Sequence, residues 1–218
     1  MRFVAPLRGR SRLVLAAILL TAGIEPASAQ PPTGFSPLFA GSLGEATIEN
    51  GGTFTIENRV LRAEGPNGWL RFPKLVRDFR LRVELRFVTG NGDSGIFLRA
   101  LPEGEFNRGW PNRSYQVQLL NPLAGGSLPP IGGVFRHVMP PGETALDAGA
   151  VRAAFTGTGE WQLLEIEVTG TELTVQLNGT PITRAAGIAD VAGYIGIQSE
   201  TSAVEFRRID IQELDARR

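Results

Sequence analysis

Hydrophobic and polar residues alternate with a period of two through most of the chain after residue 45. In 78–88 (DFRLRVELRFV), apolar side chains take every second position and Arg or Glu stands between most of them. Such alternation predicts a strand with one face in the core and the other in water. Segment 173–177 alternates similarly and runs into Asn178-Gly179, a pair typical of two-residue hairpin turns, and 160–168 precedes it. Further strands are expected at 46–50, 53–57, 60–64, 69–72, 94–99, 115–120, 133–137, 193–199 and 203–214.

These strands predict an all-β domain over residues 30–218. No segment there holds a helical period of 3.6 residues for three turns. About twelve short strands with tight turns favour a two-sheet antiparallel sandwich of the jelly-roll kind, or a barrel. The long connections contain many Gly and Pro residues, and we expect them to shape a binding cleft at the rims; they are 101–113, 121–132 and 138–159. The apolar phase slips by one residue between Phe206 and Ile209, which predicts a bulge near Arg207-Arg208.

Residues 1–29 have the pattern of a secretory signal peptide. Four arginines precede the apolar run 13–20, and the small-x-small sequence Ala27-Ser28-Ala29 precedes Gln30. This order of charge, apolar run and cleavage site is typical of exported proteins. We therefore expect cleavage before Gln30, a periplasmic or secreted protein, and no membrane segment afterwards.

Composition excludes several classes of function. The chain has no Cys, which excludes disulfide scaffolds, thiolate zinc sites and Cys nucleophiles. Four of the 22 basic residues and one of the 22 acidic residues precede residue 30, so the remaining chain has 18 and 21, a net charge of −3. We expect no nucleic-acid partner without a basic field. There is no P-loop, G-x-S-x-G or H-E-x-x-H motif, and the lone His137 cannot form a histidine cluster. We therefore assign no metal ligand and no cofactor.

Alternation places polar side chains opposite the aliphatic ones in three strands. They are Arg99, Gln116 with Gln118, and Gln198. Carboxamides and guanidinium groups offer the donors and acceptors that sugar hydroxyls require. We expect these residues to line one concave polar face, although a register error of one residue would reverse their direction. The alternative is an ordinary solvated sheet face.

A series of short motifs then resembles the 3-keto-disaccharide hydrolase family of exported bacterial proteins. The motifs are 34–39 (GFSPLF), 68–70 (GWL), 78–84 (DFRLRVE), 93–99 (DSGIFLR), 115–118 (YQVQ), 159–162 (GEWQ), 177–179 (LNG), 193–198 (GYIGIQ) and 204–207 (VEFR). The resemblance implies a concanavalin-like jelly roll that acts on oxidised disaccharides or glycosides. A 3-keto sugar has an acidified hydrogen at C2, so a base can remove it, the enolate can expel the C1 substituent, and water can then add.

The resemblance also suggests which residues perform this reaction. We expect Arg99 to stabilise the ketone oxygen, and Glu160 and His137 to act as base or acid. Trp110, in the long loop before the second of these strands, can stack on a sugar. Gln116, Gln118 and Gln198 would bind the sugar. Hydrolysis by two carboxylates is disfavoured because the three strands supply no acid pair.

The chain departs from the family pattern at several positions. Asp93, Gln116 and Gln162 stand where the pattern usually has Asn, Glu and Asn, and Ser199-Glu200 stands where it often has His-Gly. An amide in place of an acid keeps the shape and loses the proton chemistry. The alternatives to an enzyme are therefore a non-catalytic carbohydrate-binding module and a sandwich that binds no ligand.

Overall fold

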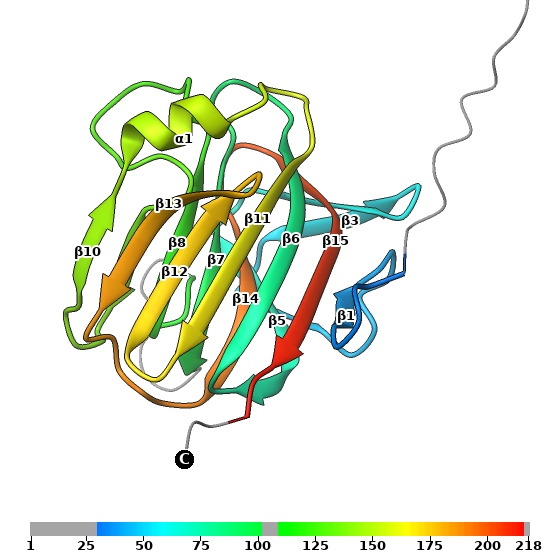
Figure 1. Ribbon diagram of the computed structural model, residues 1–218. Coiled ribbons are helices and arrows are strands. Elements are labelled where there is room, and N and C mark those ends of the chain that lie inside the picture. The colour runs from blue at the N-terminus through cyan, green and yellow to red at the C-terminus, as the bar shows by residue number, and fades with distance from the viewer. Residues whose placement is uncertain (1–29, 102–108, 216–218) are drawn as a thin grey trace, which may run out of the picture.

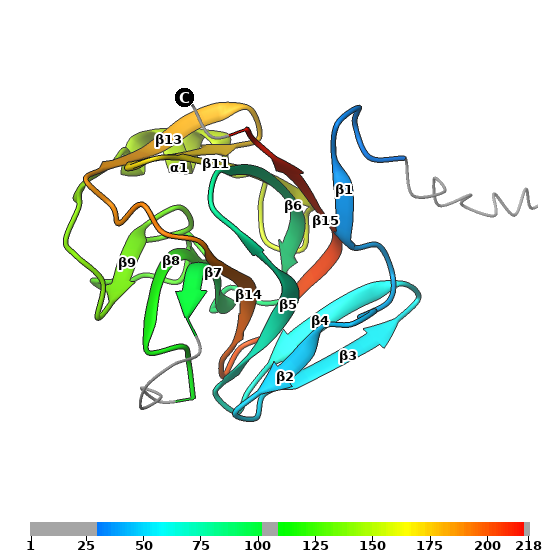
Figure 2. The same cartoon turned by 90° about the horizontal axis from the view of Figure 1, so that it is seen from below.

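The structure, a computed structural model, describes residues 30–101 and 109–215 and consists mainly of two antiparallel sheets. Figure 2 shows the sheets as layers, with β13, β11, β6 and β15 above β9, β8, β7, β14 and β5. The fold is the jelly-roll β-sandwich that the alternation predicted. The predicted signal peptide, residues 1–29, lies outside the described residues.

The larger sheet has nine strands and lies in front in Figure 1. Its order is β10-β13-β12-β11-β6-β15-β4-β3, with β1 also paired to β15. The strands are β1 (Ser36–Phe39), β3 (Thr53–Glu57), β4 (Val60–Glu64), β6 (Phe79–Phe87), β10 (Glu143–Leu146), β11 (Gln162–Thr169), β12 (Glu172–Leu177), β13 (Thr180–Ala186) and β15 (Val204–Glu213).

The smaller sheet has six strands in the order β2-β5-β14-β7-β8-β9. The strands are β2 (Thr47–Glu49), β5 (Gly68–Val76), β7 (Asp93–Leu101), β8 (Arg113–Leu120), β9 (Val134–His137) and β14 (Gly193–Ser199). Strand β7 lies between β14 and β8, so side chains from these two strands flank it on each face.

One short helix, α1 (Ala148–Ala154), interrupts the strands of the described chain. The Asp147 side chain caps it by accepting a hydrogen bond from the Ala150 backbone N–H at 2.9 Å. Within the helix, Val151 is buried. Seven residues make only two turns, too short for the helical period to stand out in the sequence. No helix among the described residues is long and apolar enough to cross a membrane.

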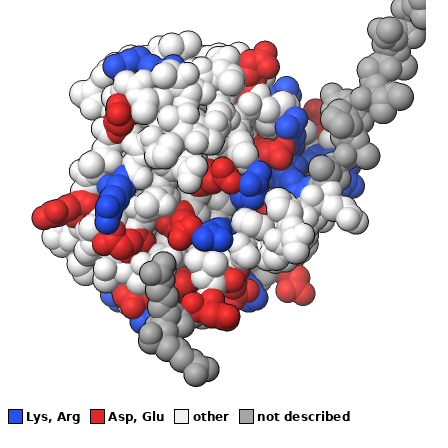
Figure 3. All heavy atoms as spheres, viewed as in Figure 1, with Lys and Arg blue, Asp and Glu red and all other residues white. Residues whose placement is uncertain are grey.

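The core lies between the two sheets and is built by the alternation seen in the sequence. Every second residue of β6, from Phe79 to Phe87, is fully buried, whereas Arg80 and Arg82 on its other face pair with Glu167 and Glu165 of β11. Figure 3 shows the resulting surface, on which acidic and basic side chains are interspersed. This face of the larger sheet therefore presents no field of one sign.

Two predicted irregularities are confirmed. The pairing of β15 with β6 shifts register between Phe206 and Arg208, as the slip in the apolar phase indicated. Between β12 and β13, Asn178 and Gly179 have φ angles of 49° and 80°. Positive φ at both positions is what a type I′ hairpin turn requires.

Candidate functional site

Three glutamines lie together on the outer face of the smaller sheet. Gln116 and Gln118 extend from β8, Gln198 extends from β14, and β7 runs between them. Their side chains share a face because the aliphatic residues between them enter the core. All three are nearly inaccessible, with 4%, 4% and 1% of their surface exposed. Buried amides need internal hydrogen-bond partners, and each of the three has them.

A glycine on the central strand allows the amides to meet. A Cβ atom at Gly95 would lie 2.4 Å from Nε2 of Gln116 and 2.7 Å from Oε1 of Gln198. The gap above Gly95 lets Gln116 reach across β7 and donate a 2.9 Å hydrogen bond to Gln198. Glycine at position 95 thus leaves room for side chains of β8 and β14 to contact each other across β7.

In each hydrogen bond between the amides and the carboxylates, the donor is the residue nearer to Gln116. Nε2 of Gln116 donates both to Oε1 of Gln118, at 2.7 Å, and to Oε1 of Gln198. Gln118 in turn donates to Oδ1 of Asp93 at 3.0 Å, and Gln198 donates to Oε2 of Glu200 at 3.0 Å. We call these five residues and His137 the amide network. Each branch starts at Gln116 and ends on a carboxylate.

His137 supplies a proton donor to the amide network. Its Nε2 lies 3.0 Å from Oε1 of Gln116; because an amide oxygen only accepts, Nε2 carries the proton. The ring makes edge contacts with Phe97 and Trp110, at centroid distances of 5.9 and 6.3 Å. Burial lowers the pKa of His137, so the ring is neutral at pH 7. Among the described residues no hydrogen-bond partner faces Nδ1, which therefore keeps its lone pair.

Aromatic side chains surround the amide network on this face. Trp69, Phe97 and Trp110 form a small buried cluster with Ala100, and Tyr194 packs against it. Trp69 meets Phe97 edge-on at 5.9 Å, and the indole N–H of Trp110 donates to the backbone oxygen of Ser199 at 3.4 Å. Aromatic surface beside convergent polar groups is the usual composition of a small-molecule site.

Asp93 ends one branch of the amide network at the start of β7. The partial burial of its carboxyl group raises its pKa to about 6, against the opposing effect of hydrogen bonds from Gln118 and Ser94. Among the described residues, no charged side chain contributes to this shift. Asp93 is therefore a carboxylate at neutral pH that takes up a proton more readily than an exposed aspartate.

The prediction that Arg99 lies beside the glutamines is wrong. The pairing of β7 with β8 shifts register after Leu98, and Arg99 has a φ angle of 50°. This bulge turns the side chain away, and Ala100 takes the outward position instead. Arg99 is fully buried and donates to backbone oxygens of Arg77, Gly170 and Ala189.

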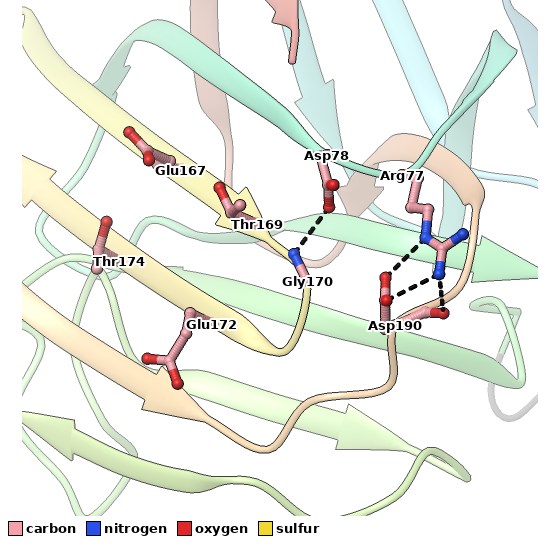
Figure 4. A pocket seen from close by; sticks show the side chains of 8 residues that line it. All are labelled: Arg77, Asp78, Glu167, Thr169, Gly170, Glu172, Thr174 and Asp190. Carbon is pink, nitrogen blue, oxygen red and sulfur yellow. Dashed lines mark hydrogen bonds and ion pairs between the residues drawn. The ribbon is translucent and has the colours of Figure 1, made fainter. Parts of the chain in front are cut away.

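Arg99 lies beside a different cleft, which Figure 4 shows. This cleft has a volume of about 410 Å³ and is lined by Arg77, Asp78, Glu167, Thr169, Gly170, Glu172, Thr174 and Asp190. Its acidic groups are engaged: Asp190 pairs with Arg77 at 2.7 Å, and Asp78 accepts from the Gly170 backbone N–H at 2.8 Å. These contacts join turns of the fold, and we assign the cleft no ligand.

Glu160 also lies apart from the glutamines. It is exposed in the turn that precedes β11 of the larger sheet. Its neighbour Gln162 is buried and bonds to Thr156 and to backbone oxygens of that turn. Glu160 is a turn residue, Gln162 begins β11, and neither contacts the amide network.

Of the residues singled out in the sequence, five lie together: Gln116, Gln118, Gln198, His137 and Trp110. Two acids at the ends of the amide network were not among the predicted site residues. From the sequence, Asp93 and Glu200 were named only as departures from the family pattern. Their sequence spacing held a signal, because residues two apart in a strand lie on the same face. Asp93 precedes Gly95 by two residues, and Glu200 follows Gln198 by two. The described residues contain no group of three or more His, Asp or Glu side chains placed to bind a metal ion.

Comparison with known proteins places this geometry in a family and a fold. No curated protein matches the chain. Two structures from Parabacteroides distasonis ATCC 8503, provisionally assigned as glycosyl hydrolases, are 18% and 19% identical, with TM-scores of 0.64 and 0.63. The matches cover 84% and 83% of this chain and 94% and 99% of those chains. The carbohydrate-binding module CBM66 from Bacillus subtilis is 10% identical, with a TM-score of 0.55 over 80% of this chain and 97% of that one.

These structural likenesses establish the fold. The family follows from the sequence match, which extends over residues 34–212 and so includes both sheets and the whole amide network. The chain belongs to the family of 3-keto-alpha-glucoside-1,2-lyase-like domains.

Proposed function

We propose that the protein is an exported enzyme that cleaves 3-keto-glycosides at the outer face of its smaller sheet. The observation that carries this proposal is the amide network. It combines a neutral imidazole, two carboxylates and three amides on a face that is otherwise aromatic. A ketone at C3 makes the C2 hydrogen acidic enough for such groups to remove.

The reaction requires one base and one proton donor. The base takes the C2 hydrogen as a proton, the C1–O bond breaks as the enolate collapses, and the leaving oxygen takes a proton. Water then adds its hydroxyl group to C1 and a hydrogen to C2, which restores the ketone and completes hydrolysis. The pKa of Asp93, about 6, suits proton transfer near neutrality, and the neutral imidazole of His137 offers an N–H donor. Trp110 lies beside His137 at this site, with 8% of its surface exposed.

An assay on 3-keto-trehalose and 3-keto-glucosides, with and without divalent metal, tests this proposal. The parent sugars serve as controls because they lack the ketone that acidifies C2. We expect turnover of the keto sugars alone. The absence of turnover of every keto sugar under both conditions would contradict the proposal.

One observation favours a second function, the binding of carbohydrate without turnover. The centre of the amide network is a carboxamide, Gln116, which neither accepts a proton nor carries charge at neutral pH. The same site can hold a sugar by hydrogen bonds and aromatic contact alone. Saturable binding of the parent and keto sugars by calorimetry, without product, would select this function.

A further inference from the structure

The carboxylates at the two ends of the amide network determine how each amide group is oriented. An ionised carboxylate only accepts hydrogen bonds, so Gln118 turns its NH₂ group toward Asp93, and Gln198 turns its NH₂ group toward Glu200. Both glutamines then present an oxygen to position 116. Only a residue with two N–H donors satisfies both oxygens, and Gln116 has them.

A carboxylate at position 116 would be incompatible with this orientation of the two flanking amides. Its oxygen would replace Nε2 at 2.7 Å from Oε1 of Gln118 and at 2.9 Å from Oε1 of Gln198. The flanking amides would have to rotate, and Oε1 of Gln118 would then face Oδ1 of Asp93. Two oxygens at about 3.0 Å repel each other unless Asp93 is protonated or is replaced by a donor.

We propose that Asp93 is the proton acceptor of this site and that Gln116 is a positioning residue matched to it. The assignment of the acceptor rests on the proposed function, whereas the matching rests on the hydrogen bonds alone. Gln116 directs the NH₂ group of Gln118 toward Asp93, and this keeps Asp93 ionised and fixed in direction.

Asp93 is better placed than Glu200 for this role. It belongs to β7, the central strand between β8 and β14, whereas Glu200 lies beyond the end of β14. The titratable side chains joined to the amide network are Asp93, His137 and Glu200. Among the described residues, none of the other charged side chains is hydrogen-bonded to Asp93. The hydrogen bonds from the Gln118 side chain and the Ser94 backbone only partly offset the burial of its carboxylate, and the resulting pKa of about 6 suits a base that works at neutral pH.

Four proteins test the proposal: the wild type, Asp93→Asn, Gln116→Glu and the double variant. The asparagine side chain still presents an oxygen to Gln118 but cannot take up the proton. We expect Asp93→Asn to lower kcat/KM on a 3-keto-glycoside by about 10²–10⁴-fold. It should also remove a pH dependence in which the wild-type rate rises as pH passes about 6.

The matching is measured without substrate. In Gln116→Glu we expect the pKa of Asp93, followed by NMR of its carboxyl carbon, to rise above the wild-type value. We also expect Tm to fall by at least about 4 °C because buried oxygens face each other. In the double variant the asparagine introduced by Asp93→Asn can turn its NH₂ group toward Gln118, so more than half of that loss in Tm should return. Glu57→Gln, which changes an exposed acid on β3 of the larger sheet, is the matched control and should behave as the wild type.

The outcomes separate the two proposals. If Asp93→Asn keeps its rate and pH profile, Asp93 is not the acceptor. If the Tm changes of Asp93→Asn and Gln116→Glu simply add, the two residues are not matched. If no keto sugar is turned over, the proposed function and the assignment of Asp93 as acceptor are both wrong. The Tm values of the four proteins and the NMR titration still test whether Gln116 and Asp93 are matched.

Discussion

Arg99 holds three chain segments together through a single guanidinium group. It donates to the backbone oxygens of Arg77, Gly170 and Ala189, and it lies 3.3 Å from Asp78. Removing one partner of a buried charged group leaves the others unpaired and costs about 3–5 kcal/mol. We expect Arg99→Ala to lower the free energy of unfolding by that amount, measured by urea denaturation.

The control for Arg99 is a neighbouring arginine. The side chain of Arg77 is half exposed, and its ion pair with Asp190 faces solvent. Exposed ion pairs contribute little to stability, so Arg77→Ala should change the free energy of unfolding far less than Arg99→Ala. Equal losses in the two variants would contradict a structural role specific to Arg99.

Asp93 should make stability depend on pH. Its pKa is about 6 in the folded protein, against an ordinary value of 3.8. Below pH 3.8 both states hold the proton and the group costs nothing. As pH rises from about 4 to about 6 the unfolded state ionises first, so stability falls. A difference of about two pKa units sets an upper bound of about 3 kcal/mol, and solvent screening of this partly exposed carboxyl reduces the loss below that bound.

Unfolding of the wild type and of Asp93→Asn between pH 4 and pH 8 measures this effect. We expect the stability of the wild type relative to Asp93→Asn to decrease by less than about 3 kcal/mol between about pH 4 and about pH 6 and to remain constant above that. A difference that does not change with pH would show that Asp93 has an ordinary pKa in the folded state.

The predictability of single residues depended on the local backbone. Strict alternation placed Gln116, Gln118 and Gln198 correctly because β8 and this part of β14 are regular near them. It failed at Arg99 because one positive φ angle reverses every side chain that follows. The acids at positions 93 and 200 were not assigned, because the role of Asp93 depends on a hydrogen bond from Gln118 on another strand, and Glu200 lies beyond the end of β14.

At the scale of elements, the central strand β7 owes its role to Gly95. A methyl group there would meet Gln116 and Gln198 within 2.7 Å and would separate two buried amides. We expect Gly95→Ala to cost about 1–3 kcal/mol, the usual penalty for buried polar groups left unpaired, and to weaken sugar binding measured by calorimetry. Gly90→Ala is the control, because a Cβ atom at Gly90 has no neighbour within 4 Å. Unchanged binding in Gly95→Ala would argue against the amide network as the sugar site.

The elements that the sequence predicts best are those with one face in the core. β6 and the β12–β13 hairpin follow directly from alternation and from the Asn178-Gly179 turn. β1, β10 and α1 were not expected because they are short and pair or pack along only a small part of the sandwich. In such segments tertiary contact, not periodicity, determines the structure.

At the scale of the whole molecule, the three kinds of sheet surface have different compositions. The two inner faces are apolar, and the outer face of the larger sheet carries exposed Arg–Glu pairs such as Arg80–Glu167 and Arg82–Glu165. The outer face of the smaller sheet instead buries polar and aromatic side chains together. Burying amides is costly unless they are hydrogen-bonded, and the hydrogen bonds that satisfy these buried amides distinguish the candidate site from a solvated sheet face. The sequence predicted that each strand has an apolar and a polar face, but it did not predict that the polar face of the smaller sheet is buried.

Export is a prediction about the whole chain. Arginines, an apolar run of signal length and Ala27-Ser28-Ala29 precede residue 30, and signal peptidases cleave after such small residues. A chain without Cys needs no disulfide to fold after export. We expect N-terminal sequencing of the protein from a periplasmic or culture-medium fraction to begin at Gln30. Ala27→Leu with Ala29→Leu should block cleavage and leave a longer, membrane-associated form, whereas Ala16→Leu, within the apolar run, should be processed normally. Recovery of the unmodified protein only from the cytoplasm, with residues 13–20 intact, would contradict export.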